Sequence, residues 1–166
     1  ALAFAVTDRS RPVKLQWSRE DDITGGYYRP AYAHKVRIGI NEDGAIVGWD
    51  HRVAGQSLFK GTFMESFAVQ NGVDNSSVEG TRDTPYKLPA FHVGVTDQKG
   101  PTTPSWWRSV GHSHTAYVME CMMDQCAIEA GIDPVEFRLG YLSGNESDQS
   151  RMARVIRLAA EKAKWG

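Results

Sequence analysis

The feature that most limits how this chain can fold is a turn sequence between two stretches of alternating apolar and polar residues. Before the turn, Tyr32, Val36, Ile38 and Ile40 share one face, with Lys35 and Arg37 on the opposite face. Asn41-Glu42-Asp43-Gly44 supplies the turn, with a glycine available for positive φ. The alternation then resumes, and its expected inward face consists of Ala45, Val47, Trp49, His51 and Val53. A period of two residues is that of a half-buried strand, so residues 31–54 are predicted to form a β-hairpin.

Two further segments show the same period of two residues, 13–17 (VKLQW) and 91–95 (FHVGV). Each is predicted to be a strand. Between the hairpin and the second of these segments, residues 56–81 are mixed in character and rich in Gly, Ser and Asn. We expect a long irregular excursion there, and such loops in compact domains are usually functional or disordered.

The last third of the chain is predicted to be helical. Apolar residues follow a helical stripe over 115–130, and Gly131 ends it. Asp133 and Pro134 suit the N-cap and first position of a second helix, 134–142. A final helix over 150–165 is expected to turn five residues inward: Met152, Val155, Ile156, Ala159 and Ala163. A helix is also expected over residues 1–7.

These elements favour an α+β two-layer sandwich, with a mostly antiparallel sheet of four or five strands and helices on one side. A length of 166 residues suits a single domain, 1–166. Trp17, Trp49, Met119 and Met123 share the expected inward faces and are predicted to be buried. Cys121 and Cys126 lie five apart in one predicted helix, a poor spacing for a disulfide within it, so both are expected to be reduced.

Charge and hydropathy argue against nucleic-acid binding and against a membrane-spanning helix. The formal net charge is −1 and no run of Lys or Arg stands out, so nucleic-acid binding has no electrostatic support. The sequence contains no apolar stretch approaching the roughly 18 residues needed to span a bilayer. The cellular compartment is not indicated by the sequence.

A loop of mixed chemistry precedes the 115–130 helix: Trp106-Trp107-Arg108-Ser109-Val110-Gly111-His112-Ser113-His114. A loop that enters a helix points free backbone N–H groups, and the positive end of the helix dipole, at whatever lies in front of it. Arg108 adds a permanent charge, and Ser109 and Gly111 let backbone approach a ligand closely. These residues predict an anion-binding loop. The alternative is a structural loop with its tryptophans on the core and its arginine in water.

No metal site or catalytic constellation is predicted. His112 and His114 lie two residues apart without further ligands at a metal-binding spacing, so we expect them to hydrogen-bond the loop or face a ligand channel. His34 and His51 are predicted to be structural. The acidic run 20–22 is predicted to be a solvated turn and helix start.

Four motifs are specific when taken together: Arg11–Asp22 (RPVKLQWSREDD), Tyr86–Pro89 (YKLP), Trp107–Gly111 (WRSVG) and Asp133–Leu139 (DPVEFRL). Their order and spacing resemble the molybdenum-binding subunit of the xanthine dehydrogenase and aldehyde oxidase family. The WRSVG form, with Gly25–Pro30 (GGYYRP) upstream, is most similar to the isoquinoline 1-oxidoreductase beta-subunit branch. The resemblance covers residues 1–166 and is weak between 56 and 81.

The resemblance implies a cofactor-binding role for Trp107, Arg108, Ser109, Val110 and Gly111. Arg108 takes the position of the arginine that lies beside the molybdenum cofactor in the family's Phe-Arg-Gly-Phe-Gly-Gly loop. Val110 replaces the loop's second phenylalanine, which clamps the substrate in xanthine-type enzymes, so the resemblance argues against xanthine. It implies molybdopterin, in the cytosine dinucleotide form, with molybdenum. It also implies an iron–sulfur small subunit as partner, and an N-heterocycle or aldehyde substrate hydroxylated with water.

Two elements of the family's subunit are missing from this chain. The family's Gly-Gly-Phe-Gly cofactor loop would precede Ala1, and its glutamate base would follow Gly166. We therefore expect an internal fragment of a molybdopterin-binding subunit, which alone has no catalytic residue, holds no cofactor or metal and is inactive. The rival hypothesis is a non-catalytic α+β protein-interaction module that binds a partner through Trp106, Trp107 and residues 56–81.

Overall fold

The predicted hairpin is the centre of the fold. The computed structural model describes residues 14–142 and 147–166, and in it β1 (Tyr32–Ile40) pairs antiparallel with β2 (Ile46–Gly55). Asn41 closes the turn by accepting a hydrogen bond from the backbone N–H of Ala45 at 2.8 Å. Gly44 has a φ of 80°, the positive value that its position in the turn requires.

The inward face of β2 differs from the prediction at its first residues. Gly39 pairs with Gly48 and Ile40 with Ile46, so Val47 is the extra residue of a β-bulge. The bulge turns Ile46 inward, at 3% exposure, and leaves Val47 53% exposed; Ala45 is also exposed. The rest of the predicted face is confirmed, since Trp49, His51 and Val53 are buried.

The sheet has three strands in the order β1-β2-β5, fewer than the four or five predicted. β5 (Phe91–Asp97) lies parallel to β2. The strand predicted at 13–17 does not form over its described residues, and Leu15 and Trp17 are 69% and 52% exposed. Alternation supplies an apolar face but no partner, and residues 14–18 pair with no strand that the structure describes.

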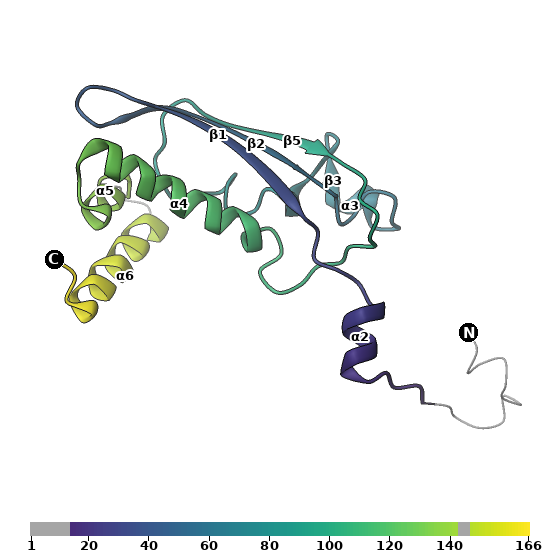
Figure 1. The fold of residues 1–166 in the computed structure, drawn as a ribbon. Coiled ribbons are helices and arrows are strands. Elements are labelled where there is room, and N and C mark those ends of the chain that lie inside the picture. The colour runs from purple at the N-terminus through teal and green to yellow at the C-terminus, as the bar shows by residue number, and fades with distance from the viewer. Residues whose placement is uncertain (1–13, 143–146) are drawn as a thin grey trace, which may run out of the picture.

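Helices cover one face of the sheet, which confirms the α+β two-layer class (Figure 1). α4 (His112–Ala130) runs along the sheet and begins three residues earlier than predicted. Asp133 caps α5 (Pro134–Tyr141), because its side chain accepts hydrogen bonds from the backbone N–H groups of Val135 and Glu136 in the first turn of that helix. A short helix, α2 (Arg19–Gly25), lies away from these layers and has no buried residue.

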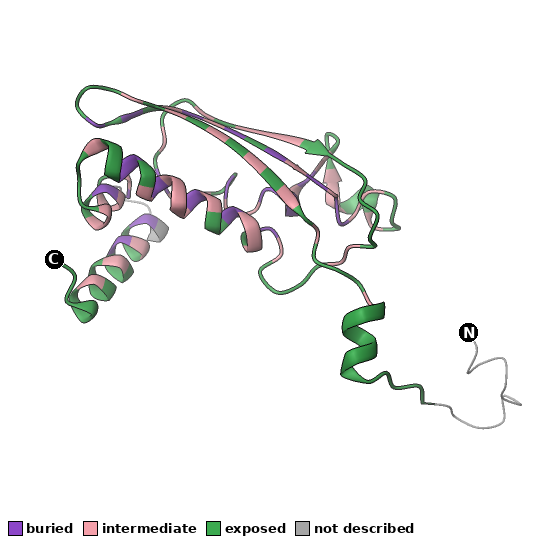
Figure 2. Cartoon of the chain, viewed as in Figure 1, coloured by how far each residue is buried: buried purple, intermediate pink, exposed green. Residues whose placement is uncertain are grey.

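α6 (Ser147–Ala163) packs on the core only through its first half. Ala153 is buried and Met152 and Ile156 are partly buried, but Val155 is 58% exposed. Ala159 and Ala163, also predicted to face inward, are exposed. The second half is mostly exposed (Figure 2), and just after it Trp165 Nε1 donates a hydrogen bond to Asp133 at the start of α5.

The core lies between the sheet and α4, α5 and the start of α6. Trp49, Met119 and Met123 are at most 2% exposed, as predicted, whereas the prediction for Trp17 is wrong. Both cysteines are free. The remaining buried members of the core are Ile46, Tyr86, Cys126, Ala127, Phe137, Leu142 and Ala153.

The excursion between β2 and β5 is ordered, although it contains little regular structure. It includes α3 (Glu65–Ala68), a two-residue hairpin of β3 (Val69–Gln70) and β4 (Val73–Asp74), and the 3-10 turn η1 (Asn75–Ser77). Asp74, 3% exposed, organises it by accepting hydrogen bonds from Ser57 Oγ at 2.6 Å and from the Leu58 and Ser76 amides at 2.9 Å. A buried carboxylate satisfied in this way fixes the backbone on both sides of the excursion.

The helix predicted over residues 1–7 lies outside the described residues. Within the described ranges, each helix is too short or too polar to cross a bilayer.

Candidate functional site

The loop singled out by the sequence is a tight, high-energy turn. The amide of Val110 donates to the carbonyl of Trp107 at 3.0 Å. Ser109 and Val110 have φ values of 76° and 39°, in the left-handed region that non-glycine residues rarely adopt, and a β-branched residue least of all. Such a conformation costs on the order of 1–3 kcal/mol per residue and persists only where the surroundings impose it.

Gly111 is the point at which the rest of the fold holds this loop. A Cβ at Gly111 would lie 2.2 Å from the carbonyl oxygen of Ser76, so only glycine fits. The Gly111 amide donates to the Glu79 carboxylate at 3.1 Å, and Thr115 Oγ1 donates to the carbonyls of both Glu79 and Gly111. The excursion therefore clamps the loop onto the start of α4 through Ser76 and Glu79.

The expected free helix N-terminus is partly used by the chain itself. The Glu79 carboxylate is bound to the amide of Gly111, and its Oε2 lies 3.9 Å from Nδ1 of His112. This negative charge at the positive end of α4 corrects the expectation that the helix end is free for an outside anion. The side chain of Arg108 is exposed and has no hydrogen bond or ion pair with the described residues.

The tryptophans beside Arg108 are neither buried nor fully solvated. Trp106 is 55% exposed and stacks on Phe59, with ring centroids 5.6 Å apart. Trp107 is 49% exposed, and the Arg29 guanidinium lies 6.0 Å from its ring centroid. Neither packs in the main core, which contradicts the structural-loop alternative for the tryptophans while agreeing with it on a solvated arginine.

Three histidines form a hydrogen-bonded chain that sequence reasoning missed. Nδ1 of His34 in β1 lies 2.8 Å from Nε2 of His51 in β2, and Nε2 of His34 lies 2.9 Å from Nδ1 of His114 in α4. The ring of Tyr32 stacks on His114 at a centroid distance of 3.8 Å. The predicted structural role of His34 and His51 is consistent with this chain, and His114 connects it to the helix that follows the loop.

Burial keeps these histidines neutral. Loss of hydration, followed by the repulsion of His34, lowers the pKa of His51 to about 4. Loss of hydration, followed by the repulsion of His34 and His51, lowers the pKa of His114 to about 4. Burial also lowers the pKa of His34. One nitrogen at each end, Nδ1 of His51 and Nε2 of His114, is buried without a hydrogen-bond partner among the described residues.

His114 and the loop border the same small cavity, which we call the loop cavity. It is lined by Arg29, Pro30, Tyr32, Leu58, Ser76, Trp106, Trp107, Val110, Gly111 and His114. Its open volume of about 10 Å³ admits a single oxygen-sized group. The predicted loop and the missed histidine are thus brought together at one place.

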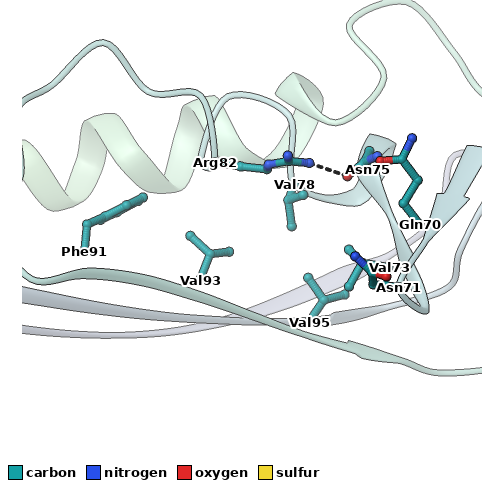
Figure 3. A pocket seen from close by; sticks show the side chains of 9 residues that line it. All are labelled: Gln70, Asn71, Val73, Asn75, Val78, Arg82, Phe91, Val93 and Val95. Atoms are coloured by element: carbon teal, nitrogen blue, oxygen red, sulfur yellow. Dashed lines mark hydrogen bonds between the residues drawn. The ribbon is translucent and has the colours of Figure 1, made fainter.

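A larger cavity, of about 460 Å³, lies on the other side of η1 at the edge strand β5 (Figure 3). Its floor is the apolar face of β5, from Phe91 to Val95, and its rim includes Arg82, which donates to the side chain of Asn75. It contains none of the predicted site residues and no carboxylate, cysteine or histidine. The predicted loop therefore lies outside this larger cavity.

The remaining candidates form no site. Asp21 and Ser18 make a capping box, which confirms that the acidic run begins a helix. Glu120 binds Tyr86 and Arg138, a network that ties α4 to α5. Within 14–142 and 147–166, no three potential metal ligands come close enough to bind one ion.

Comparison with known proteins gives one family. Residues 1–142 match the family described as molybdopterin cofactor-binding domain. The chain is 29% identical over 164 residues to isoquinoline 1-oxidoreductase subunit beta of Brevundimonas diminuta, a match that covers 98% of the chain and 20% of that relative. It is 28% identical over 172 residues to the membrane-bound aldehyde dehydrogenase [pyrroloquinoline-quinone] of Gluconacetobacter polyoxogenes, over 94% of the chain and 22% of that relative.

Among solved structures, the fold is similar to that of the aldehyde oxidoreductase from Desulfovibrio gigas. The TM-score is 0.54 at 17% identity, over 75% of this chain and 13% of that one. The chain thus spans about a fifth of the length of the curated relatives it matches.

Proposed function

The chain belongs to the molybdopterin cofactor-binding domain family, and on that premise we propose that it forms one wall of the cofactor site in a molybdenum-dependent hydroxylase. The observation that carries the proposal is Arg108, which is exposed and has no partner among the described residues, on a left-handed turn that Gly111 holds to the fold. A fixed cation on a backbone held against its own preference is a preorganised anion-binding element.

The residues present fit such a cofactor. Arg108 offers a planar fork of N–H donors suited to phosphate and oxo groups. Gly111 brings backbone close to the surface, and the buried Nε2 of His114 is a polar atom still to be satisfied. When bound, the molybdenum cofactor supplies the oxidation–reduction chemistry of hydroxylation. The share of this chain is to bind and orient the cofactor.

We propose an N-heterocycle or an aldehyde as the substrate. The relatives that support this are named for isoquinoline and for aldehydes. Val110 has a small aliphatic side chain, which cannot supply the aromatic stacking that a purine clamp needs. The cofactor is proposed to be the cytosine dinucleotide form, and electrons to leave through an iron–sulfur small subunit.

Arg108 tests the proposal in the full-length protein that carries this chain. Arg108→Ala is expected to lower turnover by roughly 10²-fold or more, the scale for losing one preorganised electrostatic donor. Arg108→Lys keeps the charge but loses the planar fork, so it should rescue only in part. Arg37→Ala is the matched control, because Arg37 is an exposed strand residue paired with Asp50 on the sheet.

Molybdenum and pterin content are measured alongside the kinetics. Near-normal turnover of Arg108→Ala at full metal loading would refute the assignment. A collapse of loading would instead place Arg108 in cofactor retention. Extracting and identifying the bound cofactor also shows whether it is a pterin or the quinone for which the Gluconacetobacter relative is named.

A second candidate, a protein-interaction module, is favoured by one observation. Phe63 and Phe67 in the excursion are 94% and 80% exposed, and Trp106 and Trp107 are half exposed. Exposed aromatics of this kind mark interaction surfaces. A full-length protein purified with neither pterin nor molybdenum, yet folded, would favour the module over the hydroxylase.

A further inference from the structure

The two hydrogen bonds between His34, His51 and His114 can both donate toward His114 or both toward His51, and the tautomers of the rings determine which. Each neutral imidazole carries one N–H, and both nitrogens of His34 are hydrogen-bonded to other imidazoles. Two arrangements are therefore possible. Either all three rings carry hydrogen on Nε2 and donate from His51 through His34 to His114, or all three carry it on Nδ1 and donate in the opposite direction.

The buried end at His51 decides between them. Its Nδ1 has no hydrogen-bond partner among the described residues, and His51 is 0% exposed. With hydrogen on Nδ1, the second arrangement buries an unpaired donor there. The first leaves an unfilled lone pair at His51 and places its unpaired N–H at Nε2 of His114, which is also buried but belongs to a residue that borders the loop cavity. An oxygen in that cavity can accept from it, whereas His51 borders no cavity among the described residues, and an orphaned N–H costs more than an under-used acceptor. The first arrangement is therefore the more stable one, and in it Nε2 of His114 carries a hydrogen.

From this geometry we propose that the order His51 to His34 to His114 fixes His114 as a neutral hydrogen-bond donor at the loop cavity, where it holds an acceptor oxygen of the bound ligand. The loop cavity admits one group of that size, and its wall includes His114 beside Val110 and Gly111. His114 is thus a positioning residue that selects an acceptor over a donor at this point. The ligand part of the inference rests on the proposed cofactor role of the loop.

The surroundings hold the His114 ring in place and strengthen it as a donor. Tyr32 stacks on His114 with its plane 17° from the imidazole, and the Tyr32 hydroxyl is itself bonded to the Gln56 carbonyl and Ser77. Donation along a chain polarises each bond in turn, so the last N–H is a stronger donor than that of a lone imidazole. Asp50, the residue before His51, is bound to Arg37, Arg52 and His92.

Nitrogen NMR of the 166-residue chain, labelled with ¹⁵N at histidine, tests the direction directly. We expect His34, His51 and His114 all to show the neutral Nε2–H form at pH 7, and His34→Phe to broaden or change the His114 signal. His92→Phe is the control, because His92 lies on the outer face of β5 and outside the chain of rings. A neutral Nδ1–H form at His114 overturns the proposal.

The ligand part is tested in the full-length protein by the rate at which bound pterin is released. His114→Leu is expected to release it about five- to tenfold faster, the scale of one hydrogen bond. His114→Gln, whose amide can donate, should release it near the wild-type rate. Thermal melts of each variant show whether the fold is retained, and a His114→Leu protein that melts normally and holds pterin as tightly as the wild type overturns the inference. A wild-type protein that carries no pterin contradicts the proposed function itself, whatever the histidine tautomers prove to be.

Discussion

Acid should unfold this chain through its buried histidines before most of its carboxylates are protonated. The pKa of His51 and of His114 is about 4 in the folded protein, against about 6.5 in an unfolded chain. Between these values the unfolded chain binds more protons than the folded one, so the free energy of unfolding falls as the pH falls. The stabilisation is complete above pH 6.5, declines between 6.5 and 4, and has been lost below 4.

The size of the effect follows from the change in pKa. A displacement from 6.5 to about 4 corresponds to roughly 3 kcal/mol for one histidine. With two such groups, we expect a loss of about 3–6 kcal/mol between pH 7 and pH 4. That is comparable with the whole stability of many domains, about 5–15 kcal/mol.

Urea melts of the 166-residue chain at half-unit steps from pH 7.5 to 4.5 would measure this slope. This pH range is chosen because Asp50 and Asp133 also have lowered pKa values, but their contribution to stability is lost only at pH values below the range. The double variant H51L/H114L should show a much flatter slope, whatever its absolute stability. His92→Gln should keep the wild-type slope. A wild-type free energy of unfolding that is constant from pH 7 to pH 5 would mean that the histidines are solvated and the chain of rings does not form.

Three further outcomes are expected. Trp49→Ala should cost on the order of 3–5 kcal/mol in a denaturant melt because it leaves a large cavity, whereas the exposed Trp17→Ala should cost less than about 1 kcal/mol; equal losses would contradict the assigned sheet. Gly111→Ala should lower the melting temperature and release the loop, since its Cβ would meet the Ser76 carbonyl at 2.2 Å, and an unchanged melt would contradict the clamp. The isolated chain should bind no stoichiometric molybdenum and hydroxylate no N-heterocycle, because one wall is not a preorganised site; metal analysis and a dye-reduction assay check this, and sustained turnover would disprove it.

The sequence predicted best where local pattern and local geometry agree. Alternation on both sides of Asn41–Gly44 defines a hairpin because the strands and their turn are contiguous. Asp133 and Pro134 likewise define the start of α5 within a few residues. The strand predicted at 13–17 does not form, because alternation indicates a face and not a partner. The last helix forms as predicted, but Val155, Ala159 and Ala163 do not face inward, because periodicity does not show how much of a helix the core covers.

The loop was predicted from its residue types, but the residues that hold it in place were not predicted. Ser76 and Glu79 lie more than thirty positions before Gly111, in a segment whose irregular backbone has no period to detect. The histidine pair did leave a signal. The hairpin turn sets His34 opposite Val53 and Val36 opposite His51, which places both imidazoles on one face as diagonal neighbours. His114, eighty residues from His34, could be added only with the fold in hand.

The parallel pairing of β2 with β5 has a consequence for the order in which this protein acquires its binding surface. Parallel neighbours cannot be joined by a short turn, so the chain must leave at Gly55 and return at Phe91, and closing that connection costs entropy before its contacts compensate. Ser76 and Glu79 belong to the connection, and they hold Gly111. The hairpin can form early from local contacts, while the turn that carries Arg108 takes its shape only after the slow, non-local step. We therefore expect a newly made chain to be folded at its centre before the loop has its final shape, so that the pairing of the parallel strands sets the rate at which the proposed ligand site forms.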